Sequence, residues 1–356
     1  MSDDKIIVGI TQGDMNGIGP EVIIKTFTEP MILELCTPVV FSSQKMFSIH
    51  RKQMGVEDFS FNLVRDLSQL NPKRPNLFNV YDEDLNVEFG VASPVAGRYA
   101  LRSIDAACDA LLSGDIDVIV TAPIDKNSVA AELPGFNGHT DYLRKKLGAD
   151  HSLMLLLKDN LRVGLVTDHV PLREVAQHIT KDNIVKKAKL MAKSLLEDFG
   201  IRKGKIAILG LNPHAGDGGA LGKEEQEIIA PAVEQLKNEG VLAFGPYAAD
   251  GFFGSGAFEK FDGVLAMYHD QGLAPFKALA FSGGVNFTAG MKYVRTSPDH
   301  GTAYDLAGKN LANESSFREA IYTAIDIFRR RKEWEEISAD PLKPQPRQKE
   351  GRERER

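Results

Sequence analysis

The stretch Phe261–Lys277, FDGVLAMYHDQGLAPFK, joins a short apolar run to a polar end that can carry chemistry. Val264–Tyr268 has the length and apolar character of a strand that is covered on both faces of a parallel sheet. His269 and Asp270 follow this run directly. Ligands of open α/β sheets bind beyond the carboxyl ends of such strands, so this pair is predicted to face a ligand. For this stretch alone, a histidine tied into a loop by hydrogen bonds is an equal alternative.

Two further histidines follow strand-like runs in the same way. Arg162–Thr167 leads to His169, and Lys205–Gly210 leads to His214. In one parallel sheet these two histidines and His269 would project at the same edge. Three neutral imidazoles with an open position make a catalytic site for Zn²⁺ or a similar divalent ion. Three unrelated loop histidines are the alternative interpretation.

Polar residues near the third histidine extend this candidate site. Asp250 and Asp270 are candidates for orienting the metal ligands, for binding the metal themselves or for accepting a proton. Lys277, Asn286 and Arg295 form a sparse polar set that could hold a phosphate, since arginine grips phosphate with two hydrogen bonds and lysine acts as a point charge. For any one of these residues taken alone, a solvated surface position is the favoured alternative.

Strand-like and helical runs alternate along the chain, which is the pattern of an α/β protein with a parallel sheet. The length of 356 residues allows two lobes. A loop-rich region is predicted from Phe281 to Ala307, followed by a closing helix over Ser316–Glu335 and a disordered tail over residues 337–356. The other predicted elements are strands over Ile6–Ile10, Pro38–Phe41 and Val118–Val120, a helix from Glu21 and a helix over Ala96–Leu112.

Composition excludes several classes of protein. A net charge of -6 supplies no basic field for nucleic acid. Cys36 and Cys108 lie far apart and indicate neither a disulfide framework nor a cysteine zinc site, which favours a reducing cytoplasm. The acidic start is unlike a signal peptide, and no apolar stretch approaches the roughly 20 residues that span a bilayer. We therefore expect a cytoplasmic protein without membrane or nucleic-acid partners.

Two nucleotide-binding patterns fail on inspection. GGALGKE, residues 218–224, resembles a phosphate loop, but Lys223 is followed by Glu224 in place of serine or threonine. The glycines at 13, 17 and 19 do not have the spacing of the dinucleotide fingerprint. A third stretch, SPDHGTAYDLAGK (residues 297–309), is similar to the adenosine-binding loop of isocitrate and isopropylmalate dehydrogenases, which bind NAD or NADP without that fingerprint. The cofactor-binding residues that this similarity implies are His300, Gly301, Thr302, Ala303 and Asp305.

A series of segments from about Ile7 to Phe328 resembles the 4-hydroxythreonine-4-phosphate dehydrogenases of pyridoxal phosphate biosynthesis. These segments are GDMNGIGPEV, TAPIDK, FNGHTDYL, TDHVPL, GLNPHAGDGG, GPYAADGFF, YHDQGLAPFK and SPDHGTAYDLAGK. The resemblance implies an α/β fold with two α/β/α lobes of the isocitrate and isopropylmalate dehydrogenase type and an active site in the cleft between them. Residues 1–128 and 285–335 would form the first lobe, and residues 129–284 the second lobe, with the metal site and the dimer interface.

The resemblance also implies roles for individual residues. His169, His214 and His269 would bind the divalent metal, with zinc as the first choice and magnesium or cobalt as alternatives. The phosphorylated substrate would be held by His139, Thr140, Lys277, Asn286 and Arg295. Members of the family are homodimers in which both subunits contribute metal ligands to one site, so the three histidines need not meet within one chain.

The implied reaction is the NAD(P)-linked oxidation of 4-phosphooxy-L-threonine to 2-amino-3-oxo-4-phosphooxybutanoate. This β-keto acid loses CO₂ to give 3-amino-2-oxopropyl phosphate. A paralogue that oxidises 4-phospho-D-threonate or 4-phospho-D-erythronate is one alternative. A metal hydrolase or lyase that uses the histidines without nicotinamide is a second, and a catalytically silent binding protein is a third.

Overall fold

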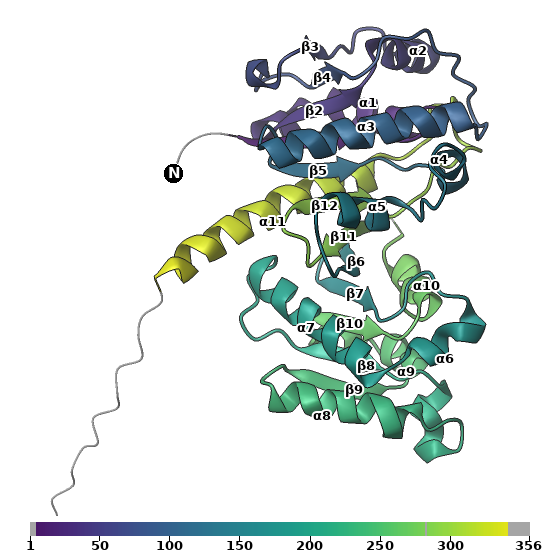
Figure 1. Ribbon diagram of the computed structural model, residues 1–356, viewed down its shortest axis with the longest axis vertical. Coiled ribbons are helices and arrows are strands. Elements are labelled where there is room, and N and C mark those ends of the chain that lie inside the picture. The colour runs from purple at the N-terminus through teal and green to yellow at the C-terminus, as the bar shows by residue number, and fades with distance from the viewer. Residues whose placement is uncertain (1–4, 282, 341–356) are drawn as a thin grey trace, which may run out of the picture.

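The computed structural model describes residues 5–281 and 283–340 and is organised around one large mixed sheet (Figure 1). The order of the strands across the sheet is β3-β4-β2-β1-β5-β12-β11-β6-β7-β10-β8-β9. In chain order the strands are β1 (Ile6–Thr11), β2 (Cys36–Ser42), β3 (Asn62–Val64), β4 (Asn76–Asn79), β5 (Val118–Thr121), β6 (Leu153–Lys158), β7 (Leu161–Leu165), β8 (Ile206–Leu209), β9 (Ala243–Tyr247), β10 (Gly263–Ala266), β11 (Val285–Ala289) and β12 (Val294–Pro298).

The sheet is parallel toward both edges and antiparallel in its middle. Strands β3, β4, β2, β1, β5 and β12 are parallel, and so are β7, β10, β8 and β9. Between these groups, β11 pairs antiparallel with both β12 and β6, and β6 pairs antiparallel with β7. Short connections, such as the one between β11 and β12, can join only antiparallel neighbours. The expected parallel sheet is therefore interrupted at its centre.

Helices cover both faces of this sheet. Helix α3 packs on β1, β2 and β5, while α11 packs on β12, β5 and β11 and on helix α1 (Figure 1). The α-helices are α1 (Gly19–Thr28), α2 (Gln44–Met54), α3 (Pro94–Ser113), α4 (Lys126–Glu132), α5 (His139–Lys146), α6 (Val175–His178), α7 (Lys181–Glu197), α8 (Ala230–Asn238), α9 (Ala249–Gly254), α10 (His269–Leu279) and α11 (Ser315–Ala339).

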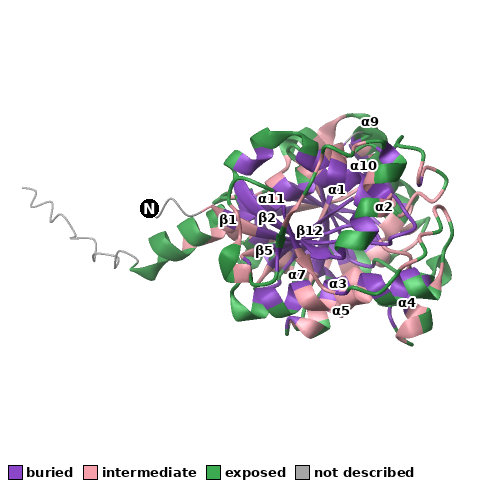
Figure 2. Cartoon of the chain, turned by 90° about the horizontal axis from the view of Figure 1, so that it is seen from above, coloured by how far each residue is buried: buried purple, intermediate pink, exposed green. Residues whose placement is uncertain are grey.

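The alternation of side chains along the central strands gives the two faces different characters. On one face, Leu155 of β6 and Phe287 of β11 belong to an apolar core to which most of the strands contribute. On the other face, Leu156 belongs to a separate apolar cluster, and Asn286 and Arg295 are polar. Buried residues concentrate along the strands (Figure 2). The second face therefore has a polar gap between two apolar clusters.

The loop-rich region predicted from Phe281 to Ala307 is wrong, because it contains β11 and β12. Polar residues on one face of both strands interrupt the apolar pattern by which a buried strand is recognised. The closing helix, predicted to end at Glu335, extends to Ala339, so the first residues of the predicted tail lie in α11. The tail prediction for residues 341–356 lies outside the described residues.

Candidate active site

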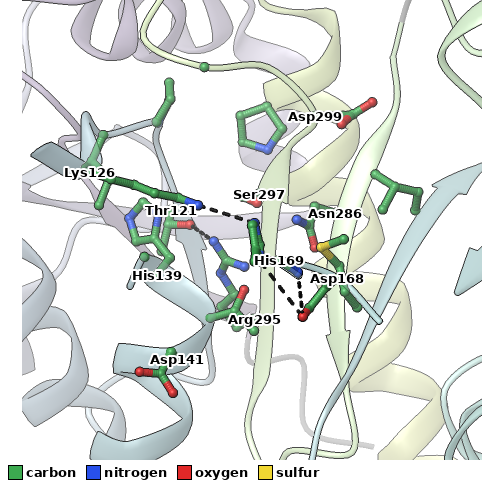
Figure 3. Close-up of a pocket in the computed structure, with 18 of the residues that line it drawn as sticks. Thr121, Lys126, His139, Asp141, Asp168, His169, Asn286, Arg295, Ser297 and Asp299 are labelled. Atoms are coloured by element: carbon green, nitrogen blue, oxygen red, sulfur yellow. Dashed lines mark hydrogen bonds and ion pairs between the residues drawn. The ribbon is translucent and has the colours of Figure 1, made fainter. Parts of the chain in front are cut away.

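A cavity of about 780 Å³ opens on the polar gap of the sheet (Figure 3). Its floor includes Asn286 of β11, Leu156 of β6, and Arg295 and Ser297 of β12. Asn286 lies opposite both Ser297 and Leu156 in the sheet, so these three side chains point to one face. Arg295 stands two residues before Ser297 and shares that face. The antiparallel centre of the sheet thus forms the bottom of the cavity.

Arg295 is a buried cation with no carboxylate partner among the described residues. Its Nη2 donates to Thr121 Oγ1 at 2.6 Å and its Nη1 to Thr288 Oγ1 at 3.3 Å, while the buried Nε has no acceptor there. Burial lowers the pKa of Arg295 to about 10, so the guanidinium stays charged at neutral pH. A buried charge without a counter-charge is costly, and a bound anion would offset that cost.

Further unsatisfied polar atoms surround this guanidinium. Nε2 of His139 and Oδ1 of Asn286 are buried and have no hydrogen-bond partner within the described residues. Burial, and then the charges of Arg295 and Lys126, lower the pKa of His139 well below its ordinary value, so its imidazole is neutral. His139 and Thr140 begin α5, and the N–H groups of a helix start favour an anion. This part of the cavity is suited to a phosphate.

Lys277 of α10 lines the same cavity. Its Nζ lies 3.7 Å from Oδ1 of Asp299, a residue that directly follows β12. Burial raises the pKa of Asp299, and the charge of Lys277 acts against this rise. The carboxylate of Asp299 therefore partly balances the charge of Lys277, whereas no carboxylate among the described residues balances that of Arg295.

His169 and His269 meet in this cavity, with ring centroids 6.0 Å apart. Nδ1 of His269 donates to Asp270 Oδ1 at 2.7 Å, which leaves the Nε2 lone pair available to a metal. Lys126 Nζ donates to Nε2 of His169 at 3.3 Å. Burial, reinforced by Lys126, lowers the pKa of His169, so this imidazole is neutral. The ring of His169 is thus in the neutral form that metal ligation requires, with Lys126 at its Nε2.

His214 lies apart from the other two histidines. It lines a second cavity of about 490 Å³ together with Asp250 and Tyr268. Strands β7, β10 and β8 are parallel neighbours, so all three histidines do follow strands that end at one edge of the sheet. Across residues 5–281 and 283–340, however, no group of three His, Cys, Asp or Glu side chains could hold a metal ion. One chain brings together His169 and His269 without His214.

The loop that carries His214 has an unusual conformation. In the segment η4 (Pro213–Gly219), the five residues from His214 to Gly218 all have positive φ. Glu225 accepts hydrogen bonds from the backbone N–H groups of Leu211 and Asn212, each at 2.7 Å. Burial raises the pKa of Glu225, but hydrogen bonds led by those from Asn212 outweigh it, and the net pKa is lowered. An ionised carboxylate thus anchors the loop that exposes His214 at the surface.

The family model of the pyridoxal phosphate biosynthetic protein PdxA matches residues 34–324. The chain belongs to the PdxA family. A 4-hydroxythreonine-4-phosphate dehydrogenase of Bacteroides thetaiotaomicron is 52% identical over 346 residues, which are 97% of this chain and 95% of that protein. A crystal structure of 4-hydroxythreonine-4-phosphate dehydrogenase from Klebsiella pneumoniae is 32% identical, covers 92% of this chain and 99% of that chain, and has a TM-score of 0.77.

A more distant structure, a terephthalate 1,2-cis-dihydrodiol dehydrogenase from Burkholderia xenovorans, is 24% identical with a TM-score of 0.60 and covers 90% of this chain and 98% of that chain. That likeness concerns the fold alone. In the part of this PdxA-family chain that the structure describes, no helix has the length and apolar character of a membrane span.

The predicted cofactor loop of this PdxA-family chain lies beside the cavity. His300 and Gly301 line it, whereas Thr302, Ala303 and Asp305 do not. The carbonyl of Thr302 accepts a hydrogen bond from the N–H of Ile18 at 3.0 Å, in the glycine-rich turn between β1 and α1. A Cβ on Gly17 would lie 2.8 Å from that carbonyl, which explains the glycine at this position. The two loops are therefore packed against each other.

Several residues that line the cavity were not predicted from the sequence as site residues, among them Lys126, Asp168 and Asp299. Lys126 and Asp168 stand in the segments TAPIDK and TDHVPL, which follow β5 and β7, and their position after a strand was a signal that could have found them. Of the predicted catalytic carboxylates, Asp250 lies in the second cavity and Asp270 contacts His269. The geometry suits Asp270 as an orienting residue.

Proposed function

We propose that this chain is a metal-dependent dehydrogenase that oxidises 4-phosphooxy-L-threonine with NAD or NADP. The product is 2-amino-3-oxo-4-phosphooxybutanoate, which decarboxylates to 3-amino-2-oxopropyl phosphate. The observation that carries the proposal is the buried guanidinium of Arg295, which has no carboxylate partner among the described residues and lies in a cavity that also holds His169 and His269. A phosphate bound there would supply the missing negative charge.

The phosphate ligands in this proposal are Arg295, Asn286, His139, Thr140 and Lys277. Arg295 supplies a fixed charge at the floor, and Lys277 supplies a second charge from α10. The unsatisfied Nε2 of His139 can donate to a phosphate oxygen in the appropriate tautomer. These groups would fix one end of the substrate and thereby orient its C3 hydroxyl toward the histidines.

The histidines fit a divalent ion that prefers nitrogen ligands, so zinc or cobalt suits the site better than magnesium. His169 and His269 would hold it through Nε2, and the bond from His269 to Asp270 would fix the ring. The bound ion would supply Lewis-acid chemistry at the substrate hydroxyl. We further propose that the third ligand, His214, comes from a second copy of the chain in a homodimer, because His214 is exposed and lies in a separate cavity.

The cofactor proposal rests on the segment from His300 to Asp305, whose sequence resembles the adenosine-binding loop of isocitrate and isopropylmalate dehydrogenases. We propose His300, Gly301, Thr302, Ala303 and Asp305 as NAD or NADP contacts. The same proposal includes a division into two lobes of that enzyme type. The first lobe comprises residues 1–128 and 285–335, and the second comprises residues 129–284. This division agrees with the change of strand direction at the centre of the sheet.

The test is an absorbance assay for reduced nicotinamide with metal-loaded protein. The substrates are 4-phosphooxy-L-threonine, 4-phospho-D-threonate and 4-phospho-D-erythronate, each with NAD⁺ and with NADP⁺. The expected result is turnover of 4-phosphooxy-L-threonine in preference to both hydroxy acids. The His169→Ala variant should lose bound metal and activity together. Turnover of only the hydroxy acids, or no turnover by protein that retains its metal, would overturn the proposal.

A further inference from the structure

Lys126 occupies the nitrogen of His169 that a metal ligand would use. It begins α4, shortly after β5, and its Nζ lies 3.3 Å from Nε2 of His169 (Figure 3). The nearest carboxylate on the other side of the ring is Asp168, whose Oδ2 lies 3.9 Å from Nδ1. One lone pair cannot bind an ammonium hydrogen and a divalent ion together. Lys126 and a metal at His169 are therefore mutually exclusive partners of Nε2.

The turn that contains Gly138 leaves space for the side chain of Lys126. This side chain passes over Gly138, where a Cβ would lie 3.0 Å from Lys126 Cε. Gly138 has a φ of 115°, directly before the start of α5. The absence of a side chain at this position leaves room for the lysine stem, so the ammonium can enter the cavity beside the predicted phosphate ligand His139.

The cations of the cavity differ in how their charge is balanced. Arg144 is paired with Asp141 at 3.1 Å, and Lys277 lies 3.7 Å from Asp299. Among the described residues, Arg295 and Lys126 are the two lining cations without a carboxylate within ion-pair distance. A ligand with two anionic groups can supply one to each of these cations, and Lys126 is the one of the two that contacts a histidine.

We propose that Lys126 exchanges partners when the metal binds. In the metal-free site it donates to His169 Nε2, and when a divalent ion takes that nitrogen the ammonium turns to the carboxylate of the substrate. The second half of this inference rests on the proposed function, in which the substrate carries a phosphate at one end and a carboxylate at the other. Arg295 serves the phosphate and Lys126 the carboxylate, so Lys126 is a specificity-determining residue.

The exchange of Lys126 at His169 is tested by titrating Co²⁺ into full-length, metal-free protein in the absence of substrate. Calorimetry measures the affinity of the protein for Co²⁺. In Lys126→Met the aliphatic stem remains over Gly138, but both the competing hydrogen bond and the repulsion between ammonium and metal are lost. We expect Co²⁺ to bind about tenfold more tightly than in the wild type. Lys145→Met, which removes an exposed lysine of neighbouring α5 that does not contact a histidine, should bind Co²⁺ as the wild type does. Equal or weaker Co²⁺ binding in Lys126→Met would overturn the exchange.

The assignment of Lys126 to the substrate carboxylate is tested by comparing the affinities of two ligands for metal-loaded protein. The ligands are 4-phosphooxy-L-threonine and ethyl phosphate, which lacks a carboxylate. Lys126→Met should bind 4-phosphooxy-L-threonine about tenfold more weakly and ethyl phosphate with unchanged affinity. Equal loss for both probes, or no loss for either, would overturn the carboxylate assignment. The Co²⁺ titration contains no substrate, so its outcome stands even if the wild-type enzyme fails to oxidise 4-phosphooxy-L-threonine. Failure of the proposed function and failure of the exchange are thereby distinguished.

Discussion

Replacement of Arg295 by methionine should stabilise the ligand-free protein while abolishing its response to phosphate. Burial lowers the pKa of Arg295 from its ordinary value to about 10, which corresponds to a desolvation cost of about 3 kcal/mol. The variant also loses two hydrogen bonds, to Thr121 and Thr288, worth about 1 kcal/mol each. The balance is a gain of about 1 kcal/mol in the free energy of unfolding without ligand.

The difference in the free energy of unfolding between Arg295→Met and the wild type changes sign when phosphate is present. A ligand at one hundred times its Kd stabilises the native state by about 2.7 kcal/mol. The wild-type protein should gain this amount from a saturating phosphate ligand, and Arg295→Met should gain almost none. The variant would thus be the more stable protein without phosphate and the less stable one with it, which a purely structural role for Arg295 cannot produce.

The measurement is urea unfolding of metal-free protein with and without inorganic phosphate. Arg331→Met is the matched control, because Arg331 is also largely buried but is paired with Asp198 at 2.6 Å. Breaking that buried pair should cost about 3 kcal/mol and leave the phosphate response intact. The reasoning about Arg295 is refuted if Arg295→Met loses more than about 2 kcal/mol without phosphate, or if it retains the wild-type gain with phosphate.

Two other predictions concern separate parts of the molecule. Asp270→Asn should weaken Co²⁺ binding by about tenfold or more, because the carboxylate that orients His269 becomes a neutral amide; an unchanged titration curve would remove Asp270 from this role. His50 is buried with its pKa lowered to about 4, so below about pH 6.5 the unfolded chain takes up a proton that the folded one excludes. Stability should therefore fall by up to about 3 kcal/mol from pH 6.5 to 4 relative to a His50→Gln variant, and a constant difference between the two unfolding curves would contradict the shifted pKa.

The strands that could be predicted from the sequence are those with apolar residues on both faces. Val264–Tyr268 predicted β10 because every residue of that strand is buried. Strands β11 and β12 were missed because one face of each carries residues of the cavity, such as Asn286 and Arg295. The feature that hides these strands from a hydrophobic pattern is the same feature that makes them the floor of the site. The sequence still named Asn286 and Arg295 as residues that could hold a phosphate, and the family resemblance implied which substrate would carry it.

The histidines show a different limit of sequence reasoning. The rule that parallel strands end at one edge placed His169, His214 and His269 together, and the strands before them are indeed parallel neighbours. The rule does not describe the loop after the strand, and the left-handed turn of η4 carries His214 into another cavity. Lys126 stands shortly after β5, a position that could have marked it as a cavity residue, but its residue type alone does not distinguish it from a surface lysine.

The cavity gathers several buried polar groups that find no partner within the described residues, and that property constrains its ligand. Arg295 holds a buried charge, while His139 and Asn286 carry buried atoms without partners. The two hydroxyls that contact Arg295 carry no charge that could balance the guanidinium. The fold bears this cost without ligand, so the free energy recovered on binding is largest for a ligand that supplies an anion at Arg295. A neutral analogue of the same shape would leave the guanidinium unpaired, and discrimination against such analogues should therefore exceed what shape alone provides.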